Sequence, residues 1–219
     1  MTNWQLQPTP KGLILQKAGS KSSLWIDFSD KKLTYRREHA SLRKEALAKA
    51  AGLRHGSNPI LLDVTAGLGQ DAFIIASLGF QIYLLERSPI VHSLLEDAIQ
   101  RGNQDENIAP ITQRMKLIHA DSLYFLEHPS IIPDIIFLDP MFPARKKTAK
   151  PGISMQIFHE VIGENNDADR LFEKSLACAT QKVVVKRPRL APPLKEQKPH
   201  FTLDGSSCRF DVYLTGKNS

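Results

Sequence analysis

Short runs of hydrophobic residues alternate with longer segments of helical spacing over most of this chain. The apolar runs predict buried strands, and the segments between them carry helix start signals, such as Ser88 followed by Pro89. The predicted strands are residues 59–64, 81–86, 115–120, 134–139 and 182–187, and the predicted helices are residues 70–79, 88–102 and 167–180, the last capped by Asp167. Residues 208–214 alternate between polar and apolar side chains, which is typical of an antiparallel strand late in the chain. The pattern predicts an α/β fold with a mostly parallel, doubly wound sheet.

The first part of the chain follows a different pattern. Residues 23–28 and 33–37 are β-rich runs on either side of "SDKK", which predicts a hairpin, and residues 39–53 predict a helix. The breaker cluster "RHGSNP" follows. We therefore expect a small basic N-terminal subdomain over residues 1–55 and a larger domain over residues 56–219.

A Gly-rich turn stands at the end of the first predicted strand of the larger domain. Ligands bind outside the carboxyl ends of the strands in such sheets. Here "LLDVTAGLGQDA" holds Gly67 and Gly69, where the absence of a Cβ lets the backbone turn tightly and approach a ligand. Glu86 ends the second strand, and a carboxylate there suits the two hydroxyls of a ribose. The loop predicts either a dinucleotide or S-adenosylmethionine as the cofactor.

Acidic residues around this turn favour S-adenosylmethionine. Asp63 precedes Gly67 in the turn, and Asp71 lies where a dinucleotide would place its phosphates, at the start of the next helix. A carboxylate would repel a pyrophosphate, whereas it suits a ligand that carries an ammonium or a sulfonium. Capping of the turn and of the helix is the alternative interpretation for these two acids.

Two further strand ends carry candidate functional residues. Asp121 and Ser122 follow the third strand, where Asp121 is suited either to accept a hydrogen bond from an adenine amino group or to cap the next helix. The fourth strand ends in "LDPMFP". The Asp139 carboxylate and the Pro140 carbonyl are suited to hold the hydrogens of an exocyclic amine, and Phe142 to stack on an extruded base. A plain strand-ending turn is the alternative.

Charge is distributed unevenly along the chain. The net charge is +6, but residues 1–55 hold 11 Lys and Arg against 4 Asp and Glu, residues 56–140 hold 4 against 11, and residues 141–200 hold 12 against 6. Basic flanks indicate a polyanionic partner such as nucleic acid, with solvated surface lysines as the alternative. The candidate RNA-binding residues are Arg145, Lys146, Lys147, Lys150, Lys186, Arg187 and Arg189.

Several stretches resemble one known family. "DVTAGLGQDAF", "LLER", "LDPMFP", "VVVKRP" and "RFDVY" stand in order between Tyr35 and Tyr213, and together they resemble the ribosomal RNA small subunit methyltransferase J family. The resemblance implies a Rossmann-like class I methyltransferase that uses S-adenosylmethionine to methylate the exocyclic N2 of one guanosine in 16S rRNA, guanosine 1516 in the family. The cofactor contacts that it implies are Gln70, Asp71, Glu86, Arg87, Asp121, Ser122 and Asp139.

Two positions depart from the family pattern. Where relatives are expected to carry a Gly-rich link after "YRRE", this chain has "HASLRK". The family-like "HASS" is "HADS" here, so we expect Asp121 to hold the adenine with a carboxylate in place of a hydroxyl.

The residues by themselves also allow other functions. A nicotinamide-dependent oxidoreductase would use "GLGQDA", a non-catalytic RNA-binding module would keep only the fold, and a methyltransferase acting on DNA adenine or on protein fits the same motifs.

The histidines show no metal-ligand spacing, so we expect no metal. Cys178 and Cys208 are expected to be reduced, buried thiols. We expect no signal peptide and no membrane span in the sequence. We expect a cytoplasmic protein whose partner is 16S rRNA or the small ribosomal subunit, with no obligate protein partner.

Overall fold

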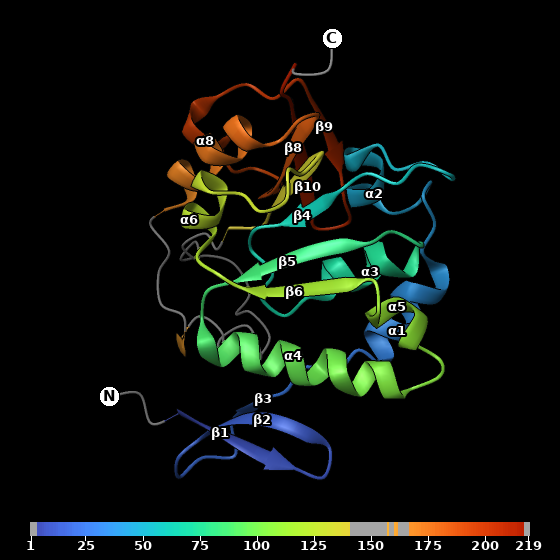
Figure 1. Cartoon of the computed structure of the whole chain (residues 1–219), viewed down its shortest axis with the longest axis vertical. Helices are drawn as coiled ribbons and strands as arrows, with labels where there is room; N and C mark the ends of the chain where they lie inside the picture. Colours follow the sequence, from blue (N-terminus) through green and yellow to red (C-terminus); the bar gives the residue numbers. More distant parts are fainter. Residues whose placement is uncertain (1–3, 141–156, 158–159, 162–166, 217–219) are drawn as a thin grey trace.

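The structure is a computed structural model that describes residues 4–140, 157, 160–161 and 167–216 (Figure 1). Its main sheet has seven strands in the order β6-β5-β4-β7-β8-β10-β9. These strands are β4 (Leu61–Asp63), β5 (Ile82–Glu86), β6 (Met115–His119), β7 (Ile135–Leu138), β8 (Lys182–Pro188), β9 (Phe201–Asp204) and β10 (Cys208–Leu214). Neighbours among β4 to β8 pair in parallel, whereas β10 is antiparallel to β8 and to β9. The predicted sheet, with its late antiparallel strand, is confirmed.

Helices cover both faces of this sheet, so its central strands β4 and β7 consist entirely of buried residues. The larger hydrophobic cluster lies under the first five helices, and the smaller one under the last two helices and the 3₁₀ turn. These elements are α1 (Lys31–His39), α2 (Ala46–Ala51), α3 (Gln70–Ser77), α4 (Pro89–Gln104), α5 (Ala109–Thr112), α6 (Ser122–Glu127), α8 (Ala168–Cys178) and η1 (Leu194–Glu196). The helix predicted after Ser88 is confirmed, and the Ser88 hydroxyl accepts a hydrogen bond from the Val91 N–H.

The strand order reverses between β4 and β7. The chain runs outward from β4 through β5 to β6, and then returns to the other side of β4 to form β7. At such a switch point the loops that follow neighbouring strands diverge and leave a crevice at the carboxyl ends of the strands. The segments that follow β4, β5, β6 and β7 are the ones in which the sequence placed its candidate cofactor and reacting residues.

The N-terminal region differs from its prediction. It forms a separate antiparallel sheet of β1 (Trp4–Thr9), β2 (Gly12–Lys17) and β3 (Ser23–Leu24), followed by α1 and α2. The hairpin predicted across residues 23–37 is wrong, because Asp30 caps α1 by accepting from the N–H groups of Lys32 and Leu33. The helix predicted over residues 39–53 is too long, because Ala40 is extended and the helix begins only at Ala46.

The N-terminal region and the main sheet share one buried core. Trp4, Leu15 and Phe28 belong to the same hydrophobic cluster as side chains of α3, α4 and the central strands. The Phe28 ring stacks on Phe73 of α3 with 4.7 Å between the ring centroids. The subdomain division at residue 55 stays a prediction. No helix in the described parts of the chain is long and apolar enough to cross a membrane.

Candidate active site

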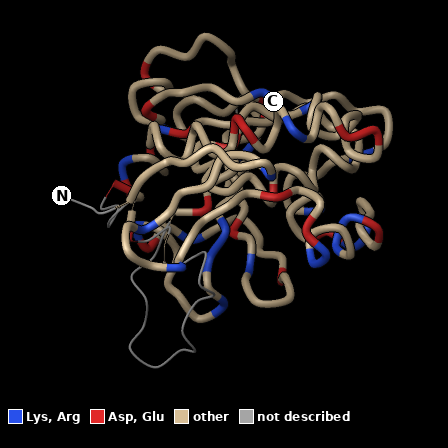
Figure 2. Tube along the Cα trace, turned by 90° about the horizontal axis from the view of Figure 1, so that it is seen from below, with Lys and Arg blue, Asp and Glu red and all other residues tan. Residues whose placement is uncertain are grey.

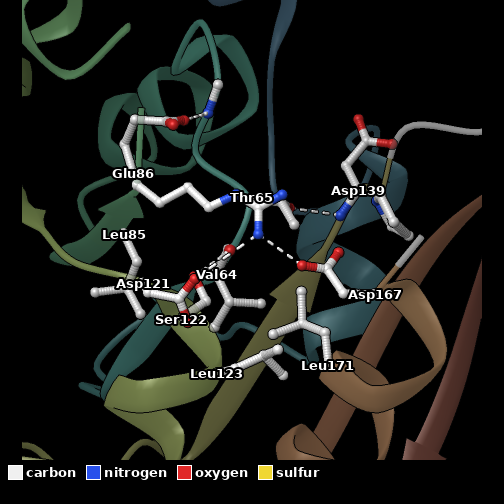
Figure 3. Close-up of a pocket in the computed structure, with 13 residues that line it drawn as sticks. Val64, Thr65, Leu85, Glu86, Asp121, Ser122, Leu123, Asp139, Asp167 and Leu171 are labelled. Atoms are coloured by element: carbon white, nitrogen blue, oxygen red, sulfur yellow. Dashed lines mark hydrogen bonds and ion pairs between the residues drawn. The ribbon is translucent and has the colours of Figure 1, made fainter. Parts of the chain in front are cut away.

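A cavity opens where β4, β5, β6 and β7 end (Figure 3). Backbone and side chains of the loops after these strands form its wall, together with the beginning of α8. The lining residues are Val64, Thr65, Gly67, Leu85, Glu86, Arg87, Asp121, Ser122, Leu123, Asp139, Pro140, Asp167 and Leu171. Tertiary structure thus gathers the predicted Gly67, Glu86, Arg87, Asp121, Ser122 and Asp139 around one space, which we call the cofactor cavity.

The turn after β4 depends on two glycines and a buried acid. Gly67 and Gly69 have φ angles of 53° and 69°, in the left-handed region that residues with a Cβ rarely adopt. Asp63 is 2% exposed and accepts hydrogen bonds from the N–H and the hydroxyl of Thr65, at 2.9 and 3.3 Å. Burial raises the pKa of Asp63 to about 7. Turn capping, the alternative given for Asp63, therefore describes its contacts in this structure.

Thr65 connects this turn to the one after β7. Its hydroxyl accepts a hydrogen bond from the Asp139 N–H at 2.7 Å (Figure 3) and donates to the Asp63 carboxylate at 3.3 Å. The contact fixes where the Asp139 backbone leaves the sheet. Sequence reasoning missed Thr65, although it stands inside the "DVTAG" motif, because its partner lies 74 residues further along the chain.

Glu86 lies at the end of β5 and faces the Gly-rich turn. Its two carboxylate oxygens accept hydrogen bonds from the N–H groups of Gly67 at 3.1 Å and Ser88 at 2.8 Å. Burial raises the pKa of Glu86 above its ordinary value, and these two donors oppose the rise. Each oxygen keeps a lone pair that is available to a ligand hydroxyl.

Arg87 closes one side of the cofactor cavity. Its guanidinium lies 2.6 Å from a carboxylate oxygen of Asp167 and 3.7 Å from one of Asp121. Asp167 occupies the N-cap position of α8, but its side chain makes no capping hydrogen bond. The prediction that this side chain caps the helix is therefore wrong, because the carboxylate pairs with Arg87 instead. Sequence reasoning did not place Asp167 in the site.

Asp121 and Ser122 make local contacts at the end of β6. The Asp121 carboxylate accepts from the Tyr124 N–H at 3.1 Å, so it caps α6 as the alternative interpretation proposed. The Ser122 hydroxyl donates to the Val64 carbonyl at 2.7 Å, which ties this loop to the turn after β4. Both residues still line the cofactor cavity, so capping and ligand contact are compatible here.

A second space of about 470 Å³ adjoins the cofactor cavity and is called the acceptor cleft below. The two spaces share Thr65, Gly67, Asp139 and Pro140 in their walls. Asp63, Gly69, Gln70 and Asp71, all predicted to contact the cofactor, line the acceptor cleft rather than the cofactor cavity. The turn at Asp139 and Pro140 is therefore the partition between two adjoining spaces.

Charged side chains from α1, α3, β8 and the turn after β7 meet in the wall of the acceptor cleft. Lys186 of β8 lies 2.7 Å from Asp71 and 2.8 Å from Asp139, and Arg36 of α1 lies 2.8 Å from Asp71 and 2.9 Å from Glu45. Burial would raise the pKa of Asp71, but Lys186 and Arg36 outweigh it and hold that pKa below its ordinary value. Asp71 is thus an ion-pair partner rather than a helix cap. The pattern of the sequence gave no signal for Arg36.

The predicted basic rim is only partly described. Phe142, Arg145, Lys146, Lys147 and Lys150 lie outside the described residues. Arg187 is 5% exposed and donates to the Pro192 carbonyl, so little of its side chain is open to solvent, and its role in RNA binding stays a prediction. Arg189 is exposed and donates to the Gly205 carbonyl.

The segments of opposite charge in the sequence partly neutralise each other in space. Basic and acidic positions are interspersed along the described trace (Figure 2). Arg36 from the basic N-terminal segment and Lys186 from the basic later segment both pair with Asp71 of the acidic middle. Some of the basic residues therefore stabilise the site and do not form an open surface for a polyanion.

The side chains that line the cofactor cavity fit S-adenosylmethionine. A carboxylate with free lone pairs at the end of β5 suits ribose hydroxyls, and Asp121 and Asp139 suit cationic or amino groups. Apolar side chains such as Leu85 and Leu123 suit the flat face of an adenine. Among the described residues, no cluster of His, Cys, Asp and Glu is arranged to hold a metal ion. Cys178 and Cys208, expected to be buried thiols, are half-buried, and neither forms a disulfide in the described parts of the chain.

Comparison with known proteins assigns the family. A family model described as "Putative SAM-dependent methyltransferase" matches residues 1–215. A protein of Colwellia psychrerythraea named ribosomal RNA small subunit methyltransferase J is 46% identical over 189 residues, which cover 86% of this chain and 69% of that protein. One of the same name from Pseudomonas syringae pv. tomato is 43% identical and covers 96% and 80%. The chain belongs to the ribosomal RNA small subunit methyltransferase J family.

A solved structure agrees with this membership. The crystal structure of a SAM-dependent methyltransferase from Neisseria gonorrhoeae is 31% identical, with a TM-score of 0.79 over 100% of this chain and 85% of that chain. The expected class I methyltransferase fold is confirmed, and S-adenosylmethionine is the cofactor of the family. The cofactor cavity is accordingly the candidate S-adenosylmethionine site.

Proposed function

We propose that this chain transfers a methyl group from S-adenosylmethionine to the exocyclic N2 of a guanosine in 16S rRNA. The observation that carries the proposal is the position of Asp139 and Pro140. They line both the cofactor cavity and the acceptor cleft, so a group held at this turn would lie between the two spaces. The names of relatives at 43% and 46% identity support rRNA as the substrate.

Residues of the cofactor cavity would hold the donor. Glu86 is placed for the ribose and Asp121 with Ser122 for the adenine end, while Gly67 lets the backbone approach the ligand and Gly69 allows the turn that follows it. Gln70 and Asp71 would contact the end of the cofactor that reaches toward the acceptor cleft. When bound, the cofactor supplies an electrophilic methyl group on a sulfonium centre.

The turn after β7 would prepare the acceptor. The lone pair of a guanine N2 is delocalised into the ring, which makes this amine a poor nucleophile. Hydrogen bonds from the amine to the Asp139 carboxylate and the Pro140 carbonyl would localise that lone pair and orient it toward the methyl carbon. Phe142 would stack on the extruded base. Most of the rate would then come from positioning rather than from a strong base.

Basic residues that take no part in the ion pairs of Asp71 with Lys186 and Arg36 would hold the RNA. Arg145, Lys146, Lys147 and Lys150 follow the reacting turn in the sequence, and Arg189 is exposed at the end of β8. Such side chains bind phosphates without reading sequence. The partner is then 16S rRNA or the small ribosomal subunit in the cytoplasm, where that subunit is assembled.

A nicotinamide-dependent oxidoreductase fits the site less well. Asp63 and Glu86, the buried acids beside the Gly-rich turn, would disfavour a pyrophosphate at the start of α3. Nor would such an enzyme use a second cleft with Asp139 and Pro140 in its wall. Tight binding of a nicotinamide cofactor without binding of S-adenosylhomocysteine in calorimetry would favour it.

The test uses small ribosomal subunits from cells that lack the enzyme, labelled S-adenosylmethionine and mapping of the labelled nucleotide. We expect one labelled guanosine with the unaltered protein, and a loss of at least about 100-fold in kcat with Asp139→Ala, the scale of losing one positioned catalytic group. RNA binding should be retained. Asp169→Ala, at an exposed position in the first turn of α8, is the matched control and should leave the rate unchanged. Unchanged transfer by Asp139→Ala, or label on another nucleotide, would contradict the assignment.

A further inference from the structure

Lys186 occupies an unusual position for a residue expected to contact RNA. Its side chain is 27% exposed, and its ammonium lies between two carboxylates, 2.7 Å from Asp71 and 2.8 Å from Asp139. An ammonium has three N–H donors, and two of them are directed at these oxygens. Asp71 is held in turn by Arg36, which also pairs with Glu45. The chain of ion pairs thus runs from α1 and α2 to the proposed reacting turn.

Lys186 is paired with two of the three aspartates in the wall of the acceptor cleft. Asp63, Asp71 and Asp139 all line it. Burial raises the pKa of Asp139 above its ordinary value, Lys186 opposes that rise, and Asp71 adds to it. Burial alone would lower the pKa of Lys186, yet Asp71 and Asp139 raise it above its ordinary value, so the ammonium stays charged.

We propose that Lys186 is a positioning residue for methyl transfer: its ammonium holds Asp139 through Oδ2, keeps that carboxylate ionised, and leaves Oδ1 to accept a hydrogen of the acceptor amine. The inference rests on the proposed function, in which Asp139 contacts the substrate. It replaces the expectation that Lys186 binds RNA. A carboxylate accepts a hydrogen bond from an amine better when ionised than when protonated, so the cation acts on the reaction through Asp139.

Other charged or titratable groups line the two spaces on either side of Asp139. On the acceptor side these are Asp63 of β4, Asp71 of α3, Arg36 of α1, Arg187 of β8 and the Cys208 thiol of β10. Across the cofactor cavity they are Glu86, Arg87, Asp121 and Asp167. Among the described residues, Lys186 is the cation that forms an ion pair with Asp139.

The test compares Lys186→Met with Lys186→Arg and with Lys182→Met. Lys182 lies on the same strand at its opposite end, which makes it a matched control outside the site. In Lys186→Met we expect kcat at neutral pH to fall about tenfold or more and the acid limb of the kcat profile to move to higher pH by about one unit or more, since an opposite charge within about 4–6 Å lowers a carboxyl pKa by about 1–3 units. Lys186→Arg should restore most of the rate, and Lys182→Met should change neither quantity.

A measurement without turnover accompanies the kinetics. Carbon NMR titration of the aspartate carboxyl groups in the free protein should move the Asp139 midpoint upward in Lys186→Met but not in Lys182→Met. Thermal denaturation checks that each variant is folded. If Lys186→Met misfolds, Lys186→Arg is used in its place. A change of kcat together with a shifted Asp139 midpoint in Lys186→Arg would support the positioning role, and a change of the KM for RNA with an unshifted midpoint would contradict it.

Two results would overturn the inference. One is a raised KM for RNA with a weaker dependence of binding on salt and an unshifted kcat profile, which would make Lys186 a phosphate contact. The other is an Asp139 midpoint that does not move. Both leave the proposed function intact if Asp139→Ala still abolishes transfer, whereas an active Asp139→Ala would instead overturn the proposed function itself.

Discussion

At the scale of single residues, the site is a set of carboxylates kept close together by different partners. Asp139 and Asp71 pair with cations and Glu86 accepts from backbone N–H groups, whereas Asp63, among the described residues, accepts from the N–H and hydroxyl of Thr65. Asp63 is therefore the acid whose charge is least compensated.

Asp63 gives the folded protein a pH dependence of stability. Its pKa is raised from 3.8 to about 7, so between these values the folded state holds a proton that the unfolded chain has released. The free energy of unfolding must then fall as pH rises through this window and level off above it. Asp63→Asn keeps an acceptor for the Thr65 N–H but cannot ionise.

We expect the stability of the unaltered protein to drop relative to Asp63→Asn by more than about 1 kcal/mol between about pH 5 and about pH 8, because one pKa unit corresponds to about 1.4 kcal/mol. Urea denaturation of both proteins at the two pH values measures this difference. Parallel stability curves would show that Asp63 is already ionised at low pH.

At the scale of secondary-structure elements, helix propensity and packing disagree at one position of α4. Gly102 lies near the end of this helix and is buried. A Cβ built on it would overlap the side chain of Thr112, the last residue of α5. The close approach of α4 and α5 therefore requires glycine, and Gly102 does not end the helix as the sequence suggested, because α4 continues to Gln104.

Propensity alone predicts that Gly102→Ala stabilises the protein by about 1 kcal/mol. The packing predicts the opposite, a loss of about 1–3 kcal/mol from overpacking. Denaturant titration decides between them. The double variant Gly102→Ala with Thr112→Ser removes the methyl group that clashes and should recover part of the lost stability. If the losses of the two single variants simply add in the double variant, the contact with Thr112 is not the cause of the destabilisation.

At the scale of the whole molecule, the N-terminal region is part of the same core as the methyltransferase sheet. Phe28 is 2% exposed and stacks on Phe73 of α3 with an interplanar angle of 3°. Arg36 of the same region joins the ion pairs of the acceptor cleft. Buried apolar contact and charge both link this region to the site.

We expect Phe28→Ala to lower the stability of the whole protein by about 3–5 kcal/mol, the usual cost of removing a buried phenylalanine. Calorimetry should show one transition that moves as a unit to lower temperature. Tyr35→Ala in the same region removes a side chain that is 65% exposed, and should change stability by no more than about 0.5 kcal/mol. Two transitions, of which only one moves, would mean that residues 1–55 unfold independently.

The sequence by itself determined the main sheet and the identity of the cofactor turn. Its buried strands are continuous apolar runs such as "ILLDV" and "IIFLD". Such runs predict strands from the sequence alone, because a strand covered on both faces of the sheet carries apolar residues on both sides. The strand-end acids also follow from local order, since parallel strands bring their carboxyl ends to one edge. Where local signals competed, as at residues 31–39, the Asp30 cap outweighed the β-rich pattern.

Only the tertiary structure decided how those acids are used. Lys186 follows Asp139 by 47 residues and Arg36 precedes Asp71 by 35, and no local pattern pairs residues so far apart. The same holds for Thr65 with Asp139 and for Arg87 with Asp167. Ion pairs and hydrogen bonds form between side chains that the fold brings within a few ångströms, so the sequence could indicate which residues carry the chemistry but not which of them hold each other.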